Sequence, residues 1–192
     1  MVTGANKSTA DGVTPLMFAA FEGHLDVVRL LISQKADVNK EDVSGDTALL
    51  RACDQGHFET VRYLLDNNAQ VNHQNSHGEN ALMYGVRYGN FALCQLLLDR
   101  DGEVNLSNVD GLTALMVAAE RGNVDILNIL LEAGAWLMAR DNDGDSALRY
   151  AALGGSVDVC QLLINKGMDT DLPNNANRTP LMSGERERVQ CL

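Results

Sequence analysis

Apolar residues recur along the chain in short blocks, and the clearest of them, LDVVRLLIS, begins at Leu25. Blocks with the same pattern return at intervals of 33 residues, and among 30 matched positions only Thr60 is plainly polar. A helix with one covered face shows a single apolar stripe. This block is apolar around most of its circumference, so it predicts a helix over about 25–33 that neighbouring copies cover on several sides.

A second helix is predicted ahead of each block, over about 15–22 in the first copy. Thr14 can accept a hydrogen bond from the free amides of a helix start, and Pro15 suits the first helical position. The equivalent cap positions hold Thr47, Asn80, Thr113, Ser146 and Thr179. The small residues Ala19 and Ala20 let neighbouring helices approach closely, and Gly23 ends the helix.

Two series of glycines share the 33-residue spacing. One series is Gly12, Gly45, Gly78, Gly111 and Gly144, and the other is Gly23, Gly56, Gly89, Gly122 and Gly155. A period of this length, with a turn and two helices in each unit, is typical of a solenoid. We therefore predict an all-α solenoid of stacked helix-turn-helix units, with five copies at 11–43, 44–76, 77–109, 110–142 and 143–175.

The two ends depart from the repeat pattern. Residues 1–10 are small and polar, and we expect a lead-in without a helix pair. Residues 176–192 open a partial sixth copy with ANRTPLM and continue as a truncated cap or tail. The first copy has no polar cap ahead of it, although terminal repeats normally need one, and this suggests a fragment of a longer protein.

The charge balance excludes several classes of partner. The net charge is −11 and 45% of the residues are hydrophobic, so the chain can bury a core but would repel a phosphate backbone. Nucleic acid is therefore a poor partner, and basic or mixed protein surfaces fit better. No apolar run could span a bilayer and no signal peptide is recognisable, so we expect a soluble chain without direct membrane insertion.

The cysteines favour a reducing compartment. Cys53, Cys94 and Cys160 occupy repeat positions that hold Ala20 or Val28 in the first copy, so they are expected to be small buried residues. Cys191 lies in the tail and is expected to be a free thiol. We therefore predict an intracellular chain, in the cytoplasm.

No arrangement of side chains predicts a calcium site. Asp141, Asp143 and Asp145 alternate as in a calcium loop, but Ser146 and Ala152 stand where that loop needs glycine and glutamate. A hairpin is the better interpretation.

The histidines are also expected to be structural. His73 and His77 have a spacing that could bind zinc on a helix, but they span a predicted hairpin and are expected to be exposed loop residues. His24 and His57 recur in register, which explains both. Neither a nucleophile with its base nor a phosphate-binding loop can be assembled, so we predict no enzyme activity, no cofactor and no metal.

The segments GVTPLMFAA, EGHLDVVRLLI and ADVN of the first copy resemble the ankyrin-repeat family. The resemblance covers 11–175 as five copies and 176–182 as the opening of a sixth. It implies a helix-turn-helix unit with a protruding β-hairpin, stacked into a curved array that binds other proteins on its concave side, where the hairpins and inner helices lie. It implies no reaction.

Two departures from the family pattern affect stability. The histidine that usually follows Thr-Pro-Leu is replaced, so the polar network it makes in the family is expected to be missing; the residues there are Met17, Leu50, Met83, Met116 and Arg149. The glycine usual after the second helix is Lys35, Asn68 and Asp101 in the first three copies, and only Gly134 and Gly167 conform. Lysine tolerates the left-handed region least, so the first repeat is expected to be the less stable end.

Partner-binding residues follow from the geometry that the resemblance implies. The hairpin positions hold Val13, Asp46, Glu79, Leu112 and Asp145. The ends of the first helices hold Phe21, Glu22, Asp54, Gln55, Arg87, Tyr88, Glu120, Arg121 and Leu153. Phe21, Tyr88, Leu112 and Leu153 are the expected anchors, because clustered exposed apolar side chains often mark an interface. Scattered exposed hydrophobic residues are the alternative.

Trp136 and two asparagines complete the candidates. Trp136 replaces polar residues of the other copies and is either an exposed binding residue or packed against Met138. Asn39 and Asn105 lie in runs similar to those modified by the asparaginyl hydroxylase that acts on ankyrin repeats.

The leading hypothesis is a non-enzymatic adaptor or scaffold that binds a protein or peptide on the concave face. The alternative is a regulatory or inhibitory ankyrin domain of a larger enzyme, channel or effector whose activity lies outside this chain. The sequence leaves the identity of the partner and the oligomeric state open.

Overall fold

The computed structural model describes residues 4, 6–180 and 182, and within them the chain forms ten α-helices in five pairs. The helices are α1 (Pro15–Phe21), α2 (Leu25–Ser33), α3 (Ala48–Asp54), α4 (Phe58–Asp66), α5 (Ala81–Arg87), α6 (Phe91–Asp99), α7 (Ala114–Glu120), α8 (Val124–Glu132), α9 (Ala147–Gly154) and α10 (Val157–Asn165). The predicted all-α repeat fold is confirmed, and so is the first helix pair to within one residue.

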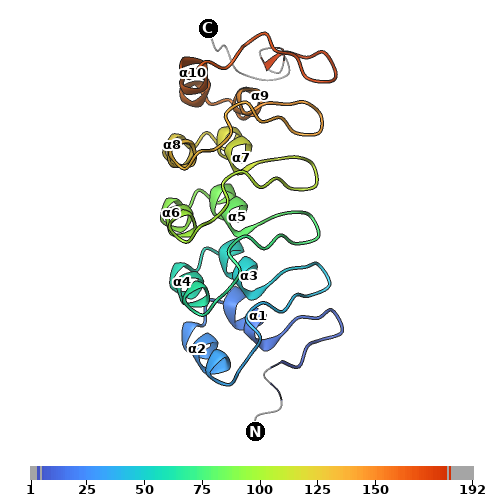
Figure 1. Ribbon diagram of the computed structural model, residues 1–192, viewed down its shortest axis with the longest axis vertical. Helices are drawn as coiled ribbons and strands as arrows, with labels where there is room; N and C mark the ends of the chain where they lie inside the picture. The colour runs from blue at the N-terminus through green and yellow to red at the C-terminus, as the bar shows by residue number, and fades with distance from the viewer. Residues whose placement is uncertain (1–3, 5, 181, 183–192) are drawn as a thin grey trace. The chain divides into compact units, whose positions relative to one another are not determined.

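The chain divides into two compact units, Met1–Glu103 with α1–α6 and Val104–Leu192 with α7–α10. In the first unit the inner helices α1, α3 and α5 contact one another in succession, and the outer helices α2, α4 and α6 do the same behind them. In the second unit α7 packs on α9, while α8 and α10 pack against their own inner helices. Figure 1 shows a long loop beside each inner helix, on the side away from the outer helices.

The loops are closed by turns rather than by a β-ladder. Among the described residues only two isolated antiparallel bridges occur, Ser107 with Thr113 and Arg140 with Ser146. In the loop before α3, the amide of Asp42 donates to the carbonyl of Asp46 at 3.1 Å, and the amide of Asp46 donates to the Asp42 side chain at 3.0 Å. The β-hairpins implied by the family resemblance are therefore loops of hairpin shape.

Helix starts follow the predicted caps. The side chains of Thr14, Thr47, Asn80, Thr113 and Ser146 each accept a hydrogen bond from the amide three residues on. At the first cap, the Met17 thioether also accepts from the Thr14 amide at 3.3 Å. Gly23 after α1 has φ of +69°, and a Cβ there would lie 2.5 Å from the His57 ring, so both conformation and space require glycine.

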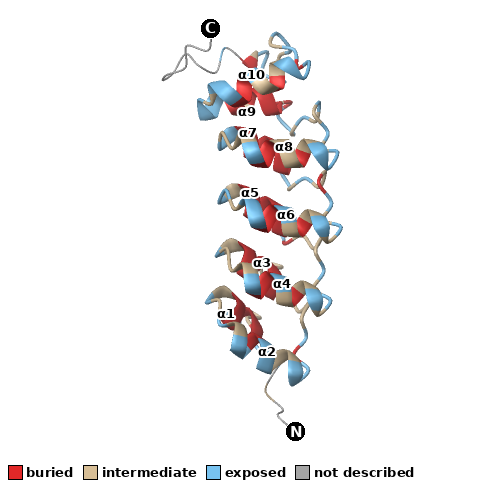
Figure 2. Cartoon of the chain, turned by 90° about the vertical axis from the view of Figure 1, so that its left-hand side faces the viewer, coloured by how far each residue is buried: buried red, intermediate tan, exposed pale blue. Residues whose placement is uncertain are grey.

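The core lies between the inner and outer helices, as Figure 2 shows. The inner helices are buried along most of their length, but each outer helix buries three residues at most, and α2 buries only Val28. Val27 is 45% exposed, whereas its equivalents are buried; they are Thr60, Leu93, Ile126 and Val159. The prediction that the outer helices are covered on several sides is therefore wrong for α2, because no described helix packs against the outward side of the first pair.

The predicted lead-in takes part in the repeat pattern. Asn6 donates to the carbonyl of Lys35 at 3.2 Å and accepts from the amide of Asp37 at 2.7 Å. Asn39, 33 residues later, makes the same two bonds to Asn68 and Gln70. Asn6 is thus the equivalent of Asn39, although residues 1–10 were expected to lie outside the repeats.

Burial of the repeat cysteines is confirmed. Cys53, Cys94 and Cys160 are all buried, and burial raises the pKa of the Cys94 thiol to about 12. The expected free thiol Cys191 and the tail 183–192 lie outside the described residues. Of the partial sixth copy, residues 176–180 and 182 are described, and Pro180 is buried.

Candidate functional site

The first unit carries an apolar pocket at the junction of the first loop with α1 and α3. It has a volume of about 270 Å³ and is lined by Val13, Met17, Phe18, Phe21, Glu22 and Arg51. Phe18 is 55% exposed, Glu22 is exposed, and Val13 and Phe21 are half-buried. Sequence reasoning identified Val13, Phe21 and Glu22 but missed Phe18. The sequence feature that could have identified Phe18 is variation at its position, since the equivalent residues in the other copies are Arg51, Tyr84, Val117 and Tyr150.

Arg51 borders this pocket, but its charge is already engaged. Its Nη2 lies 2.5 Å from Asp42 Oδ2 and 3.3 Å from Asp46 Oδ2. Asp46 also accepts from Asn75 at 2.8 Å and is only 9% exposed. Asp46, which the sequence analysis placed among the partner-binding residues, is therefore buried, and its carboxylate joins two neighbouring loops.

Asp42 is the most strongly held carboxylate of this network. Burial alone would raise its pKa, but hydrogen bonds from Arg51 and from the amides of Asp46 and Ser44, with the charge of Arg51, hold that pKa below its usual value. Asp42 is therefore a charged structural residue.

A second pocket of the first unit lies at the C-terminal ends of α3 and α5 and has a volume of about 420 Å³. It is lined by Asp54, Gln55, Gly56, Tyr88 and Asn90. Tyr88 is 58% exposed, and its hydroxyl donates to Asp54 Oδ1 at 2.9 Å. This bond, more than the partial burial of Tyr88, raises the pKa of the tyrosine. Gln55 is exposed and donates to the other Asp54 oxygen at 2.7 Å.

The remaining predicted residues of the first unit, Glu79 and Arg87, are half-buried and form an ion pair with each other. The Glu79 hydrogen bond is the main cause that raises the pKa of the Arg87 guanidinium. Arg87 also lies 5.3 Å from the centre of the Tyr84 ring. Both arginines of this surface are thus paired with carboxylates of the same unit.

The second unit holds the other predicted residues. Arg121 is exposed, Leu153 is 51% exposed, and Leu112 is half-buried, so the expectation of an exposed anchor is weakened for Leu112. Trp136 is 66% exposed and Met138 is 57% exposed. These values favour an exposed Trp136 over a tryptophan packed against Met138. Trp136 comes from the segment after α8, not from a loop tip or an inner helix.

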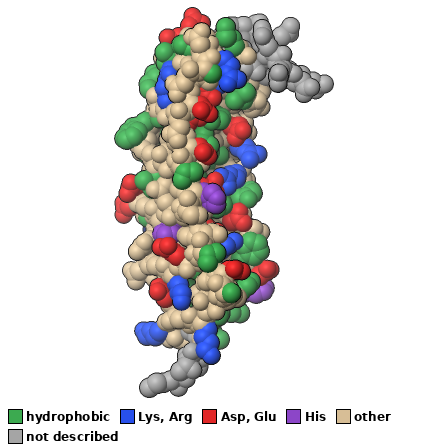
Figure 3. Space-filling model, turned by 90° about the vertical axis from the view of Figure 1, so that its right-hand side faces the viewer, with side chains coloured by type: hydrophobic (Ala, Val, Ile, Leu, Met, Phe, Trp, Pro, Cys, Tyr) green, Lys and Arg blue, Asp and Glu red, His purple; other side chains and the backbone are tan. Residues whose placement is uncertain are grey.

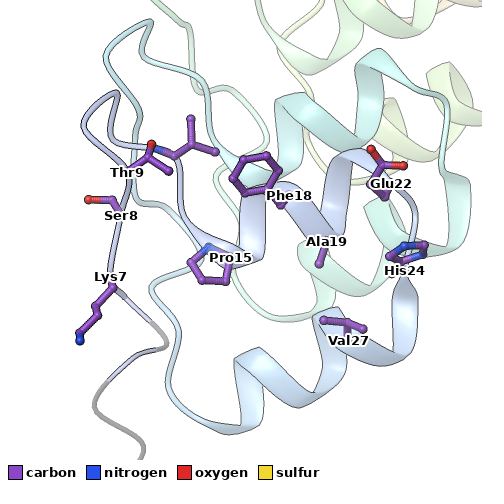
Figure 4. Close-up of a pocket in the computed structure, with 10 residues that line it drawn as sticks. Lys7, Ser8, Thr9, Pro15, Phe18, Ala19, Glu22, His24 and Val27 are labelled. Atoms are coloured by element: carbon purple, nitrogen blue, oxygen red, sulfur yellow. The ribbon is translucent and has the colours of Figure 1, made fainter.

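A third pocket, of about 560 Å³, lies on the outward side of the first helix pair. Figure 4 shows Pro15, Phe18 and Ala19 of α1 and Val27 of α2 along it, with Lys7, Ser8 and Thr9 on the loop. In the second and third copies the positions of Pro15 and Val27 are buried, where the preceding helix pair of the same unit packs against them.

The repeat geometry agrees with one family model, described as ankyrin repeats (3 copies), which matches residues 2–75, 67–141 and 133–191. The chain belongs to the ankyrin-repeat family. Comparison with curated proteins gave no match. Ankyrin repeats are generally non-enzymatic protein–protein interaction modules.

The asparagines singled out in the ankyrin repeats have both side-chain groups engaged. Asn39 donates to the carbonyl of Asn68 at 2.9 Å and accepts from the amide of Gln70 at 2.9 Å. Asn105 donates to the carbonyl of Gly134 at 3.1 Å and accepts from the amide of Trp136 at 2.8 Å. Each therefore links the segments that follow two successive outer helices.

Of the histidines, His57 is structural as expected, because its Nε2 lies 2.9 Å from the Phe21 carbonyl of the preceding ankyrin repeat. His77 is exposed as expected. The expectation is wrong for His73, which is half-buried with its Nε2 2.7 Å from the Gly45 carbonyl.

The aspartate run and Arg149 are also held inside the fold. Asp141 Oδ1 accepts from the amides of Asp143 and Asp145, and Oδ2 accepts from Tyr150 at 2.6 Å, which supports the hairpin interpretation. Arg149 Nε lies 2.7 Å from Asp145 Oδ1, and its Nη1 lies 3.3 Å from the carbonyl of Thr179. In the fifth copy, where Arg149 stands in place of the family's histidine, this arginine makes polar contacts of its own.

Two features of the described residues bear on other functions. No group of three or more His, Cys, Asp and Glu side chains in that part of the chain is placed to hold a metal ion. No described helix combines the length and apolar character needed to cross a membrane.

Proposed function

We propose that this chain is a non-enzymatic adaptor that binds a protein or peptide partner through its loops and the ends of its inner helices. The observation that carries the proposal is the pair of pockets in the first unit, one centred on Phe18 and Phe21 and the other on Tyr88. Phe18 and Tyr88 are exposed and Phe21 is half-buried, and aromatic residues of this kind beside pockets are typical of the residues that dominate binding energy.

The chemistry around these pockets supports a protein partner. Figure 3 shows hydrophobic, acidic and basic side chains interspersed on the side that carries the loops. Interfaces combine apolar anchors with a polar rim in this way. The residues proposed to contact a partner are Val13, Phe21, Glu22, Gln55, Glu79, Arg87 and Tyr88 in the first unit and Leu112, Arg121 and Leu153 in the second, with Trp136 as an additional contact from the segment after α8.

The test is capture of proteins from cell extract by the intact chain, by the double variant Phe21→Ala/Tyr88→Ala, and by Phe91→Ala. Phe91 is a matched control because it is 44% exposed but begins the outer helix α6. Thermal unfolding shows that each variant is folded. We expect proteins retained by the intact chain and by Phe91→Ala to be lost with the double variant. Equal retention by the folded double variant, or no specific capture by the intact chain, would refute the proposal.

A further inference from the structure

The two pockets of the first unit differ in chemistry, and this difference indicates what kind of segment fits them. The pocket between α1 and α3 is lined mainly by apolar side chains, with Phe18 55% exposed. The pocket between α3 and α5 is lined mainly by polar residues, and Asp54 lies in it beside the exposed ring of Tyr88. The surface of the first unit thus has one pocket suited to an apolar side chain and one pocket that contains a carboxylate.

The charge left on this surface is acidic. Arg51 is paired with Asp42 and Asp46, and Arg87 is paired with Glu79, so neither guanidinium is available to an acidic partner without breaking an internal pair. Glu22 at the rim of the apolar pocket is exposed and makes no side-chain hydrogen bond or ion pair within the described part of the chain. Among the described residues, the Asp54 carboxylate accepts hydrogen bonds only from the neutral groups of Tyr88 and Gln55. A cation on the partner would therefore meet uncompensated carboxylates at both pockets.

The spacing between the pockets sets the length of the segment. Phe21 and Asp54 are equivalent positions of adjacent repeats, and their helices α1 and α3 pack directly on each other. Packed helices lie about 10 Å apart. An extended chain covers about 10 Å in three residues.

We propose that the first unit binds an extended basic segment that places one large aliphatic side chain in the Phe18–Phe21 pocket and an arginine, three residues away, against Asp54 and Tyr88. Arginine suits the second pocket because its guanidinium can pair with a carboxylate and stack on an aromatic ring. This assignment rests on the proposed function and names the class of partner.

The probe is the peptide GRGGLGGRG, which carries an arginine three residues from leucine on either side and so serves both chain directions. It is titrated into the 15N-labelled intact chain, with two control peptides, GEGGLGGEG and GRGGGGGRG. We expect amide shifts at residues lining the two pockets, with each control peptide binding about tenfold more weakly, because one reverses the charges and the other lacks the anchor.

Two conservative variants separate the pockets from general acidity. Asp54→Asn can still accept from Tyr88 but lacks the charge, and we expect it to weaken GRGGLGGRG about threefold. Asp99→Asn is the matched control, because Asp99 is also bonded to a glutamine, Gln95, but lies on the outer helix α6. Phe18→Ala is expected to weaken the peptide about fivefold, with the fold checked by thermal unfolding.

The inference would be overturned if the glutamate peptide bound as tightly as the arginine peptide, if Asp54→Asn and Asp99→Asn behaved alike, or if no shift occurred near the pockets. Those results leave the proposed function standing when extract proteins are still lost with Phe21→Ala/Tyr88→Ala. If that double variant retains its partners, the proposed function fails as well.

Discussion

Tyr88, the residue that caps the C-terminus of α5, donates its hydroxyl to Asp54 of α3 across 2.9 Å, so the ends of two neighbouring inner helices are joined at the surface proposed to bind a partner. The bond is exposed, whereas the similar bond from Tyr150 to Asp141 is short, 2.6 Å, and half-buried. A hydrogen bond contributes more when both partners are removed from water.

We therefore expect Tyr88→Phe to lower the free energy of unfolding by about 0.5 kcal/mol and Tyr150→Phe by about 1.5 kcal/mol. Urea unfolding of both variants beside the wild-type chain measures the difference. Equal losses would show that burial does not separate the two bonds.

The network of Asp42 and Arg51 predicts a dependence of stability on pH. The pKa of Asp42 is lowered by folding from its ordinary value of 3.8, so the stability it contributes is present above that value. This contribution to stability is lost as the pH falls through the pKa that Asp42 has in the folded chain. We expect the wild-type chain to lose more unfolding free energy than Asp42→Asn on going from about pH 5 to about pH 3.

Asp99→Asn, an exposed change on α6, is the control for this experiment and is expected to keep the wild-type pH profile. Parallel profiles for wild type and Asp42→Asn would mean that the carboxylate is not held by Arg51 as the structure shows.

The side chain of Asn39 links two successive repeats through two hydrogen bonds of 2.9 Å. Asn39→Ala leaves the carbonyl of Asn68 and the amide of Gln70 without this partner, and we expect a loss of about 1–2 kcal/mol in unfolding free energy. Asn165→Ala is the control, because within the described part of the chain the Asn165 side chain makes one exposed hydrogen bond, which it accepts from Gln161. A loss no larger than that of the control would count against a linking role.

Lys35 has a φ of +65°, in the left-handed region that a lysine adopts at a cost. Lys35→Gly is therefore expected to raise the free energy of unfolding by about 1 kcal/mol. The reverse change, Gly134→Lys, introduces the same backbone strain at a φ of +86°. An added Cβ there meets nothing within 4 Å, so the change tests the strain without a clash. It should destabilise by a similar amount, and chemical denaturation of both variants checks the pair. Changes of the same sign would contradict the argument from backbone strain.

Local features of the fold could be predicted from the sequence because they follow local rules. The caps at Thr14 and Asn80 and the left-handed glycine Gly23 depend on a few neighbouring atoms, and all three are as expected. Because the pattern recurs every 33 residues, the same cap and turn can be predicted in each copy.

The surface was harder to predict because it depends on which side chains meet across repeats. Asp46 and Glu79 occupy equivalent loop positions, yet Asp46 is buried against Arg51 and Asn75 while Glu79 is half-buried against Arg87. Exposure of Val27 depends on what covers the first helix pair. The burial of Asp46 and Glu79 and the exposure of Val27 therefore cannot be predicted from the sequence of a single repeat.

Hydrogen–deuterium exchange of the intact chain, with and without a captured partner, tests the proposed binding surface most directly. We predict slower exchange in the loops that precede α1, α3 and α5 and at the ends of those helices, with the outer helices α2, α4 and α6 unchanged. Protection confined to the outer helices, with the loops unaffected, would contradict the proposal that the loops and inner helices bind the partner.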